Sequence, residues 1–160
     1  MDILIREATL DDAQLIAHLT RACWQDKVAE SSSGHKETAE RVANDLQLGG
    51  GFILLIDEEP AGSVRWQPME ADSDTWEMLR MGVLPAFRGT GLSQHLLEAV
   101  IHCAQISGVE ELRLGVRVDQ PRLLDLYAAY HFEPAPELEY SHANPDEPAP
   151  SVMRRFLKRM

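Results

Sequence analysis

The sequence predicts a mixed α/β fold in a single domain. The chain of 160 residues is long enough for one sizeable hydrophobic core, and it shows no internal repeat and no sign of a second unit, so residues 1–160 are expected to fold together. Short apolar or alternating segments, which are typical of strands, are separated by longer segments with apolar residues at helical spacing. Both kinds of element around one core indicate the mixed class.

Composition and patterning exclude several classes of protein. The contents of 44% hydrophobic and 26% charged residues are ordinary for a soluble globular protein. No apolar run approaches the roughly 20 residues of a membrane span, and the acidic N-terminus lacks a secretion signal. Cys23 and Cys103 form neither a CxxC motif nor a metal-binding pair. A cytoplasmic protein with reduced thiols and no membrane partner is therefore expected.

The formal net charge of −11 bears on the choice of partner. Nucleic-acid binding depends on clustered Lys and Arg, so this balance disfavours a nucleic-acid partner. A negative field steers cations toward the protein, which favours a cationic partner. The sequence leaves both a monomer and a homodimer open.

The first residues alternate between strand and helix signals. Ile3–Glu7 alternates as a strand, and Thr9 is placed to cap a helix that continues toward Trp24. Ser31–Gly34 is a flexible break in this pattern. Lys36–Leu48 then fits a second helix.

Three glycines and a hairpin follow. Gly49–Gly51 could be read as a phosphate loop, but they follow a helix and precede a strand, which is the wrong order, so they are interpreted as a helix stop and turn. Phe52–Ile56 is continuously apolar and predicts a strand that is buried on both faces. Asp57–Pro60 predicts a turn into a third strand at Ser63–Gln67.

A fourth strand is expected at Thr75–Val83. Strict alternation would divide its side chains between the two faces of the sheet. One face would hold Glu77, Leu79, Met81 and Val83, and the other Met78, Arg80 and Gly82. Beyond it, apolar residues at helical spacing predict a long helix that ends near Gly108.

The last third of the chain predicts two further strands and a helix. Leu112–Val118 alternates as a fifth strand, and Pro121 opens a helix at a position that favours proline. The stretch Pro134–Pro150 is proline-rich and acidic, with a short strand expected at Glu139–His142. Ser151–Leu157 is the expected closing strand.

A glycine-rich turn, Arg88-Gly89-Thr90-Gly91, joins the fourth strand to the long helix. Such a turn exposes unpaired backbone N–H groups at the positive end of the helix dipole, where they and the Arg88 guanidinium suit a phosphate or pyrophosphate. The turn lacks the lysine of a Walker A loop and the third glycine of a dinucleotide fingerprint. A plain tight turn is the alternative interpretation.

The stretch 78–100 resembles the central motif of the GNAT-type N-acetyltransferases, V-x-P-x-x-R-G-x-G. The matching residues are Val83, Pro85, Arg88, Gly89 and Gly91, while Ser93 replaces the Gly or Ala of the wider pattern. Asp119–Tyr127 resembles the family's N-x-x-A-x-x-L-Y, with Gln120 in place of Asn. The resemblance spans about residues 2–135. It implies a central mixed, mostly antiparallel sheet of about six to seven strands with splayed fourth and fifth strands, flanked by about four helices.

The resemblance also implies a binding site for acetyl-CoA as co-substrate. The backbone of the fourth strand would pair with the pantetheine arm, and the glycine turn would hold the pyrophosphate. The implied cofactor-binding residues are Met81, Gly82, Val83, Arg88, Gly89, Thr90, Gly91, Leu92, Ser93 and Gln120. The segment from Trp24 to Glu37 would border the acceptor mouth.

Two residues stand at the positions of catalytic groups. Tyr127 matches the family's general acid, which protonates the departing CoA thiolate; a core tyrosine is the alternative. Glu77 is the candidate base that removes a proton from the acceptor amine, and a solvated strand-end acid is its alternative. Further candidates for the base are His131, Asp119 and Glu7. Arg80 could pair with Glu77, bind a substrate carboxylate or lie on the surface.

The predicted function is an N-acetyltransferase that transfers an acetyl group from acetyl-CoA to a primary amine of a small molecule, peptide or protein, by direct transfer in a ternary complex. A non-catalytic acyl-CoA-binding regulatory module of the same fold is the alternative, and a nucleotide-binding domain is a third interpretation. His95 and His102 lie seven positions apart on the long helix, but no carboxylate or cysteine completes a metal site, so no metal is expected.

Overall fold

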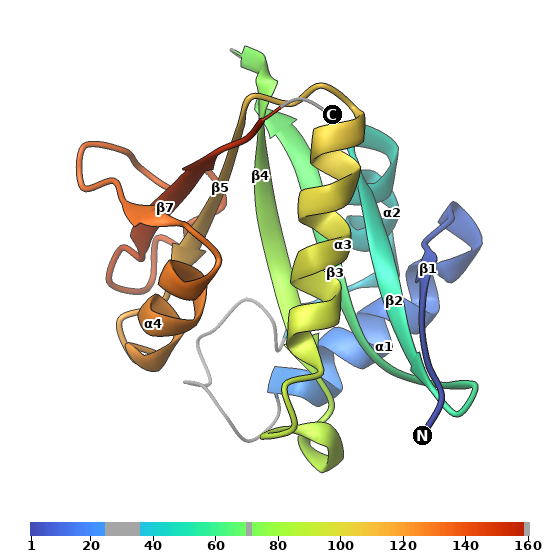
Figure 1. Ribbon diagram of the computed structural model, residues 1–160. Helices are drawn as coiled ribbons and strands as arrows, with labels where there is room; N and C mark the ends of the chain where they lie inside the picture. The colour runs from blue at the N-terminus through green and yellow to red at the C-terminus, as the bar shows by residue number, and fades with distance from the viewer. Residues whose placement is uncertain (25–35, 70–71, 159–160) are drawn as a thin grey trace.

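Helices cover both faces of a twisted, mixed sheet (Figure 1). The computed structural model describes residues 1–24, 36–69 and 72–158. Among these, seven strands pair in the order β1-β2-β3-β4-β5-β7-β6, and every pair is antiparallel except β4–β5. The strands are β1 (Ile3–Glu7), β2 (Gly50–Ile56), β3 (Glu59–Met69), β4 (Asp72–Val83), β5 (Glu111–Val116), β6 (Glu133–Pro134) and β7 (Ser151–Phe156). The predicted mixed, mostly antiparallel sheet is thereby confirmed.

Four helices flank the sheet in the described part of the chain: α1 (Ala13–Trp24), α2 (Ala39–Leu48), α3 (Ser93–Ile106) and α4 (Arg122–Ala129). Within the same residues, none of the helices is long and apolar enough to cross a membrane. Before α1, the Asp12 carboxylate accepts hydrogen bonds from the backbone of Thr9 and from Arg6. The bonds from Arg6 are the main reason that the pKa of Asp12 falls to about 2.

The core lies in two layers, one on each face of the sheet. Ile53 is fully buried in a cluster with residues of α1 and α2, whereas its neighbour Leu54 is fully buried in the cluster around α3. The prediction that Phe52–Ile56 is buried on both faces is confirmed. Full burial of an aliphatic side chain contributes about 1.5–3 kcal/mol, so both layers stabilise this strand.

Several element boundaries differ from the predicted ones for local reasons. The second helix begins at Ala39 rather than Lys36, because the Thr38 hydroxyl accepts a hydrogen bond from Arg41 N at 3.2 Å and caps the helix. The turn after β2 is confined to Asp57 and Glu58, both with positive φ. Pro60 lies inside β3 beside a bulge, since Leu54 pairs with Gly62 and Leu55 with Pro60, and its missing N–H is tolerated there.

The C-terminal boundaries also need correction. The fifth strand ends at Val116, and Val118 lies beyond it with 58% of its surface exposed. The predicted strand at Glu139–His142 is wrong, because these residues pair with no strand and instead fold across the sheet. The predicted break at Ser31–Gly34 lies outside the described residues.

A β-bulge interrupts the predicted alternation of β4. Ser63 is paired with Gly82 and Arg65 with Leu79, so two residues of β4 lie opposite one of β3. Arg80 has a φ of 57°, in the left-handed region that non-glycine residues seldom adopt. The bulge reverses the faces beyond it: Val83 joins the α3 layer, and a Cβ at Gly82 would meet Cys23 and Trp24 of α1. The prediction that Val83 shares the face of Glu77 was therefore wrong.

β4 and β5 splay apart, as the resemblance implied. They pair only where Thr75–Glu77 meets Glu111–Arg113. Beyond this point β4 stays with β3 and β5 stays with β7. Figure 1 shows the two strands meeting at one end and separating toward the end where β4 leads into α3.

A buried ion cluster joins α2 to β3 on the other face. The Arg65 side chain is 0% exposed, and its guanidinium lies 2.6 Å from Glu37 and 2.7 Å from Asp45. Thr20 of α1 accepts a further hydrogen bond from Arg65 at 3.3 Å. Charges this deeply buried are tolerated only when they are paired, so the cluster fixes both helices against the sheet.

Replacing Arg65 with Met should destabilise the protein by about 3–5 kcal/mol, because it removes the buried guanidinium that pairs with both Glu37 and Asp45 and leaves Glu37, among the described residues, with only its longer contact to Arg80. Arg154→Met is the matched control, since its partners Glu133 and Glu137 are 58% and 56% exposed. The control should lose less than about 1 kcal/mol. Urea unfolding at neutral pH measures both values, and equal losses would show that Arg65 has no special structural role.

Candidate active site between β4 and β5

The turn before α3 exposes a row of backbone donors. Gly89 and Gly91 have φ values of 80° and 75°, which glycine adopts without strain. Within the described residues, no protein acceptor is recorded for the backbone N–H groups of residues 89–93. A Cβ placed on Gly89 would have no heavy atom within 4 Å, so these donors are open to approach. They lie at the N-terminus of α3, which is suited to an anion.

Side-chain contacts hold this turn in shape. The Arg88 guanidinium donates a hydrogen bond to the carbonyl of Cys23, in the last turn of α1. The Thr90 hydroxyl donates to the carbonyl of Phe87 at 2.7 Å. Through Arg88, the turn is tied to the C-terminal end of α1.

Two adjoining cavities occupy the space between the splayed strands, and they share lining residues from α1, β4, the segment after β5, and α4. The shared residues are Trp24, Met81, Arg117 and Leu123. The smaller cavity brings together four of the predicted cofactor-binding residues, Met81, Gly82, Val83 and Gln120. A Cβ at Gly82 would lie 2.8 Å from the Trp24 ring, so glycine allows α1 to approach the strand here. The other six predicted residues, Arg88, Gly89, Thr90, Gly91, Leu92 and Ser93, lie in the turn and the start of α3, outside both linings.

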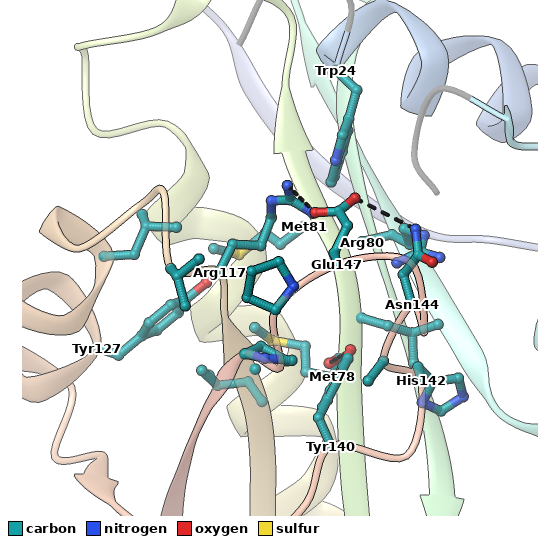
Figure 2. A pocket seen from close by; sticks show the side chains of 18 residues that line it. Trp24, Met78, Arg80, Met81, Arg117, Tyr127, Tyr140, His142, Asn144 and Glu147 are labelled. Atoms are coloured by element: carbon teal, nitrogen blue, oxygen red, sulfur yellow. Dashed lines mark hydrogen bonds and ion pairs between the residues drawn. The ribbon is translucent and has the colours of Figure 1, made fainter. Parts of the chain in front are cut away.

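The larger cavity has a volume of about 140 Å³ and is walled by β4, β5, α4 and a C-terminal segment. Tyr127 of α4 lines it, and Figure 2 shows the hydroxyl pointing into the space. Burial raises the pKa of Tyr127 above its usual range, so the hydroxyl is protonated at neutral pH. A protonated hydroxyl thus faces this cavity, and the role of Tyr127 as acid stays a prediction.

Glu77 lies beside this cavity but not among its lining residues. Its side chain is only 1% exposed, and its carboxylate contacts the Ser141 hydroxyl and His142 Nδ1. His142 Nε2 in turn lies 3.0 Å from the amide oxygen of Gln67. The structure thus places Glu77 beneath the C-terminal segment, and its role as base stays a prediction.

Residues 138–150, named here the strap, cross the gap between β4 and β5 and roof the larger cavity. The Tyr140 hydroxyl donates to the carbonyl of Met78 on β4 at 3.0 Å. The same ring packs against Gly115 of β5, where a Cβ would approach it to 2.9 Å. Tyr140 therefore fills the splay and contacts both strands.

A second attachment closes the opposite end of the strap. Arg117 donates to Glu147 at 2.6 Å, and Asn144 lies 3.4 Å from the same carboxylate (Figure 2). Arg117 also pairs with Asp119 at 3.1 Å. Burial alone would lower the pKa of Arg117, but the hydrogen bonds to both carboxylates outweigh it and raise the pKa.

Sequence reasoning missed the strap as part of the site. The sequence predicts only a proline-rich acidic tail at Pro134–Pro150, with a short strand at Glu139–His142. Two signals in it were available: an aromatic residue and a histidine, Tyr140 and His142, stand within a proline-rich acidic segment. Such residues in a loop are more often functional than those in a core.

Of the remaining candidates, two lie away from the cavities and two lie in or beside them. Glu7 is on the edge strand β1, which β2 and β3 separate from β4, and His131 is an exposed residue with a φ of 68° after α4. Asp119 faces Arg117. Arg80 lines the larger cavity and lies 3.4 Å from Glu37, a partner that the sequence did not predict. Across the described ranges, no group of His, Cys, Asp and Glu is arranged to hold a metal ion.

Comparisons with known proteins agree with this geometry. The PaiA N-acetyltransferase from Thermoplasma acidophilum, solved in complex with coenzyme A, superposes with a TM-score of 0.78 at 17% identity, covering 98% of this chain and 99% of that one. The ribosomal-protein-S18-alanine N-acetyltransferase from Escherichia coli gives 0.76 at 18% identity, over 99% and 96% of the two chains. A phosphinothricin acetyltransferase from Sinorhizobium meliloti in complex with AcCoA gives 0.75 at 18%, over 98% and 89%.

At these identities the structural likeness establishes the fold. Comparison with curated proteins found no match. The sequence profile of the Acetyltransferase (GNAT) family matches residues 14–132, which is most of the chain and includes β4, the glycine turn, α3 and α4. The chain therefore belongs to the GNAT acetyltransferase family.

Proposed function

We propose that this protein is an N-acetyltransferase that transfers an acetyl group from acetyl-CoA directly to a primary amine bound in the same complex. The main support is one continuous arrangement. Free backbone donors at the start of α3 stand at the wide end of the splay, and two adjoining cavities lead from Val83 and Gln120 to the hydroxyl of Tyr127.

The described residues fit acetyl-CoA. Five consecutive amides, those of residues 89–93, have no recorded protein acceptor and would hold the pyrophosphate. On the side facing β5, the β4 backbone has lost its strand neighbour beyond Glu77, which leaves Met81–Val83 able to pair with the pantetheine amides. Bound there, acetyl-CoA supplies an activated acetyl thioester.

Tyr127 is the proposed general acid. As the amine attacks the thioester carbonyl, a C–N bond forms and the C–S bond breaks, and the Tyr127 hydroxyl gives its proton to the sulfur. Backbone N–H groups of β4 would stabilise the charge that develops on the carbonyl oxygen. The raised pKa of Tyr127 keeps the proton in place until the sulfur develops negative charge.

Glu77 is the proposed base. An alkyl amine is protonated at neutral pH and has to lose a proton before it attacks. Because Ser141 and His142 cover the Glu77 carboxylate, the proton would reach it through the Ser141 hydroxyl or a water molecule. The same contacts also make Glu77 an anchor of the strap, and experiment can separate the two roles.

The overall proposal is tested by incubating the purified protein with acetyl-CoA and a panel of primary amines, with CoA release as the readout. Amine-dependent CoA release above the background hydrolysis rate is expected. Calorimetry with acetyl-CoA provides the second arm. Binding of acetyl-CoA without turnover of any amine would favour the non-catalytic acyl-CoA-binding module, and binding of ATP or NAD in place of CoA would contradict both.

Tyr127→Phe should lower kcat by ~10²-fold, because it removes the proton donor and keeps the ring. The affinity for CoA should be unchanged, since the phenol oxygen is the only atom lost. Steady-state kinetics and calorimetry measure the two quantities. Unchanged kcat would remove Tyr127 from the acid role, and a proportionate loss of CoA affinity would indicate a packing role.

Glu77→Gln should lower kcat by roughly 10²-fold at neutral pH if Glu77 is the base. The defect should shrink as the pH rises toward the amine pKa of about 10, where the free amine no longer needs a base. Tyr140→Phe is the control, because it weakens the strap through its bond to Met78 and leaves the carboxylate in place. The control should change the KM for the amine and leave kcat unchanged. If Glu77→Gln does the same, Glu77 only anchors the strap and is not the base.

A further inference from the structure

The larger cavity is lined by a single carboxylate among the residues that the structure describes, that of Glu147 in the strap. Its side chain is only 10% exposed. Figure 2 shows this carboxylate at the roof of the cavity, between Arg117 and Asn144. A charged group in such a position needs partners of opposite charge.

Among the described residues, the ion pairs around the cavity join more carboxylates than arginines. The two arginines that line it, Arg80 and Arg117, each contact a carboxylate from outside the lining, at 3.4 Å and 3.1 Å. The carboxylate that Arg80 contacts, that of Glu37, also belongs to the buried Arg65 cluster. Within the described part of the chain, the groups joined by these pairs are three arginines and four carboxylates, namely Arg65, Arg80 and Arg117 with Glu37, Asp45, Asp119 and Glu147.

The Glu147 carboxylate retains acceptor capacity on the cavity side. Oε2 accepts from Arg117 Nη2 at 2.6 Å, and Oε1 accepts from Asn144 Nδ2 at 3.4 Å. A carboxylate offers about four lone-pair positions, so these two contacts leave about two.

The remaining walls favour an alkyl chain with a cationic end. Trp24, Tyr140 and Met81 contribute apolar and aromatic surface to the lining. Such surface accommodates methylene groups, and its low polarity strengthens the attraction between a cation and the Glu147 carboxylate. An acceptor with its own carboxylate would instead place a second negative charge beside that of Glu147.

We propose that Glu147 binds the ammonium group of the acceptor, so that the site selects cationic primary alkylamines over amines that carry a carboxylate. This inference rests on the proposed N-acetyltransferase function. It assigns Glu147 to capture of the ammonium form; the amine then gives its proton to Glu77 and attacks as the free base, while Tyr127 protonates the departing sulfur. It also assigns the strap to acceptor recognition.

Glu147→Gln should raise the KM for n-butylamine about tenfold or more, the range for loss of one charge-assisted contact, and should change kcat by less than about threefold. Asp119→Asn is the matched control. Asp119 pairs with the same arginine but does not line the cavity. Its KM should stay within about twofold of the original value, because the carboxylate that faces the acceptor remains.

Binding provides a readout that does not depend on turnover. The protein saturated with CoA is titrated with n-butylammonium chloride and, separately, with the neutral butan-1-ol. The cation should bind about tenfold tighter than the alcohol, and Glu147→Gln should abolish this preference. Equal binding of the two probes, or binding of neither, would overturn the proposal, as would an equal effect of the Asp119 control.

The zwitterion 4-aminobutyrate tests the substrate class. Its kcat/KM should be at least about tenfold below that of n-butylamine. A preference for the zwitterion would show that an arginine of the cavity binds a substrate carboxylate, which contradicts the inference and leaves the acetyltransferase proposal standing. Conversely, a protein that turns over no amine but still prefers the cation in the titration would refute the proposed function alone.

Discussion

The structure depends on the strand β4, which pairs with β3 along its length but with β5 only at one end. β4 stays paired with β3 as far as Val83, but it parts from β5 after Glu77. Backbone groups inside a protein need hydrogen-bond partners, so a break within a sheet has to be filled. The hydroxyl of Tyr140 donates a hydrogen bond to the carbonyl of Met78. The following residues of β4 border the cavities. The same break therefore creates both the strap's anchor and the two cavities.

The bulge at Arg80 determines which side chains face this space. With two residues of β4 opposite one of β3, Gly82 turns toward α1 and Val83 toward the α3 layer. The buried Arg65 cluster holds α1 and α2 against the neighbouring strand, which keeps Trp24 close to Gly82. The strained backbone at Arg80 and the buried Arg65 cluster thus act together. They hold Gly82 against Trp24 and so fix one wall of the cavities.

Much of the fold could be predicted because the signals were local. The glycines of the turn at 88–91, the apolar stripe of α3 and the continuous run of β2 each reflect a constraint within a few residues. The bulge at Arg80 could not be predicted, because an arginine in the left-handed region has no sequence signature of its own. The strap was missed for a related reason. Tyr140 and Glu147 are placed by contacts with Met78 and Arg117, which are remote in the sequence, and no periodic pattern reports such contacts.

The two halves of the site are encoded in different ways. The donors and cavity walls expected to hold acetyl-CoA come from β4, the glycine turn, the start of α3 and the segment before α4. Their positions therefore depend on the helices and strands of the fold itself. The strap, which roofs the larger cavity and is proposed to contact the acceptor, is one contiguous stretch without helix or strand, fastened by side chains at a few points. The sequence of such a stretch can change while the sheet stays the same. On the proposed function, acceptor preference is therefore free to diverge faster than the residues that carry out acetyl transfer.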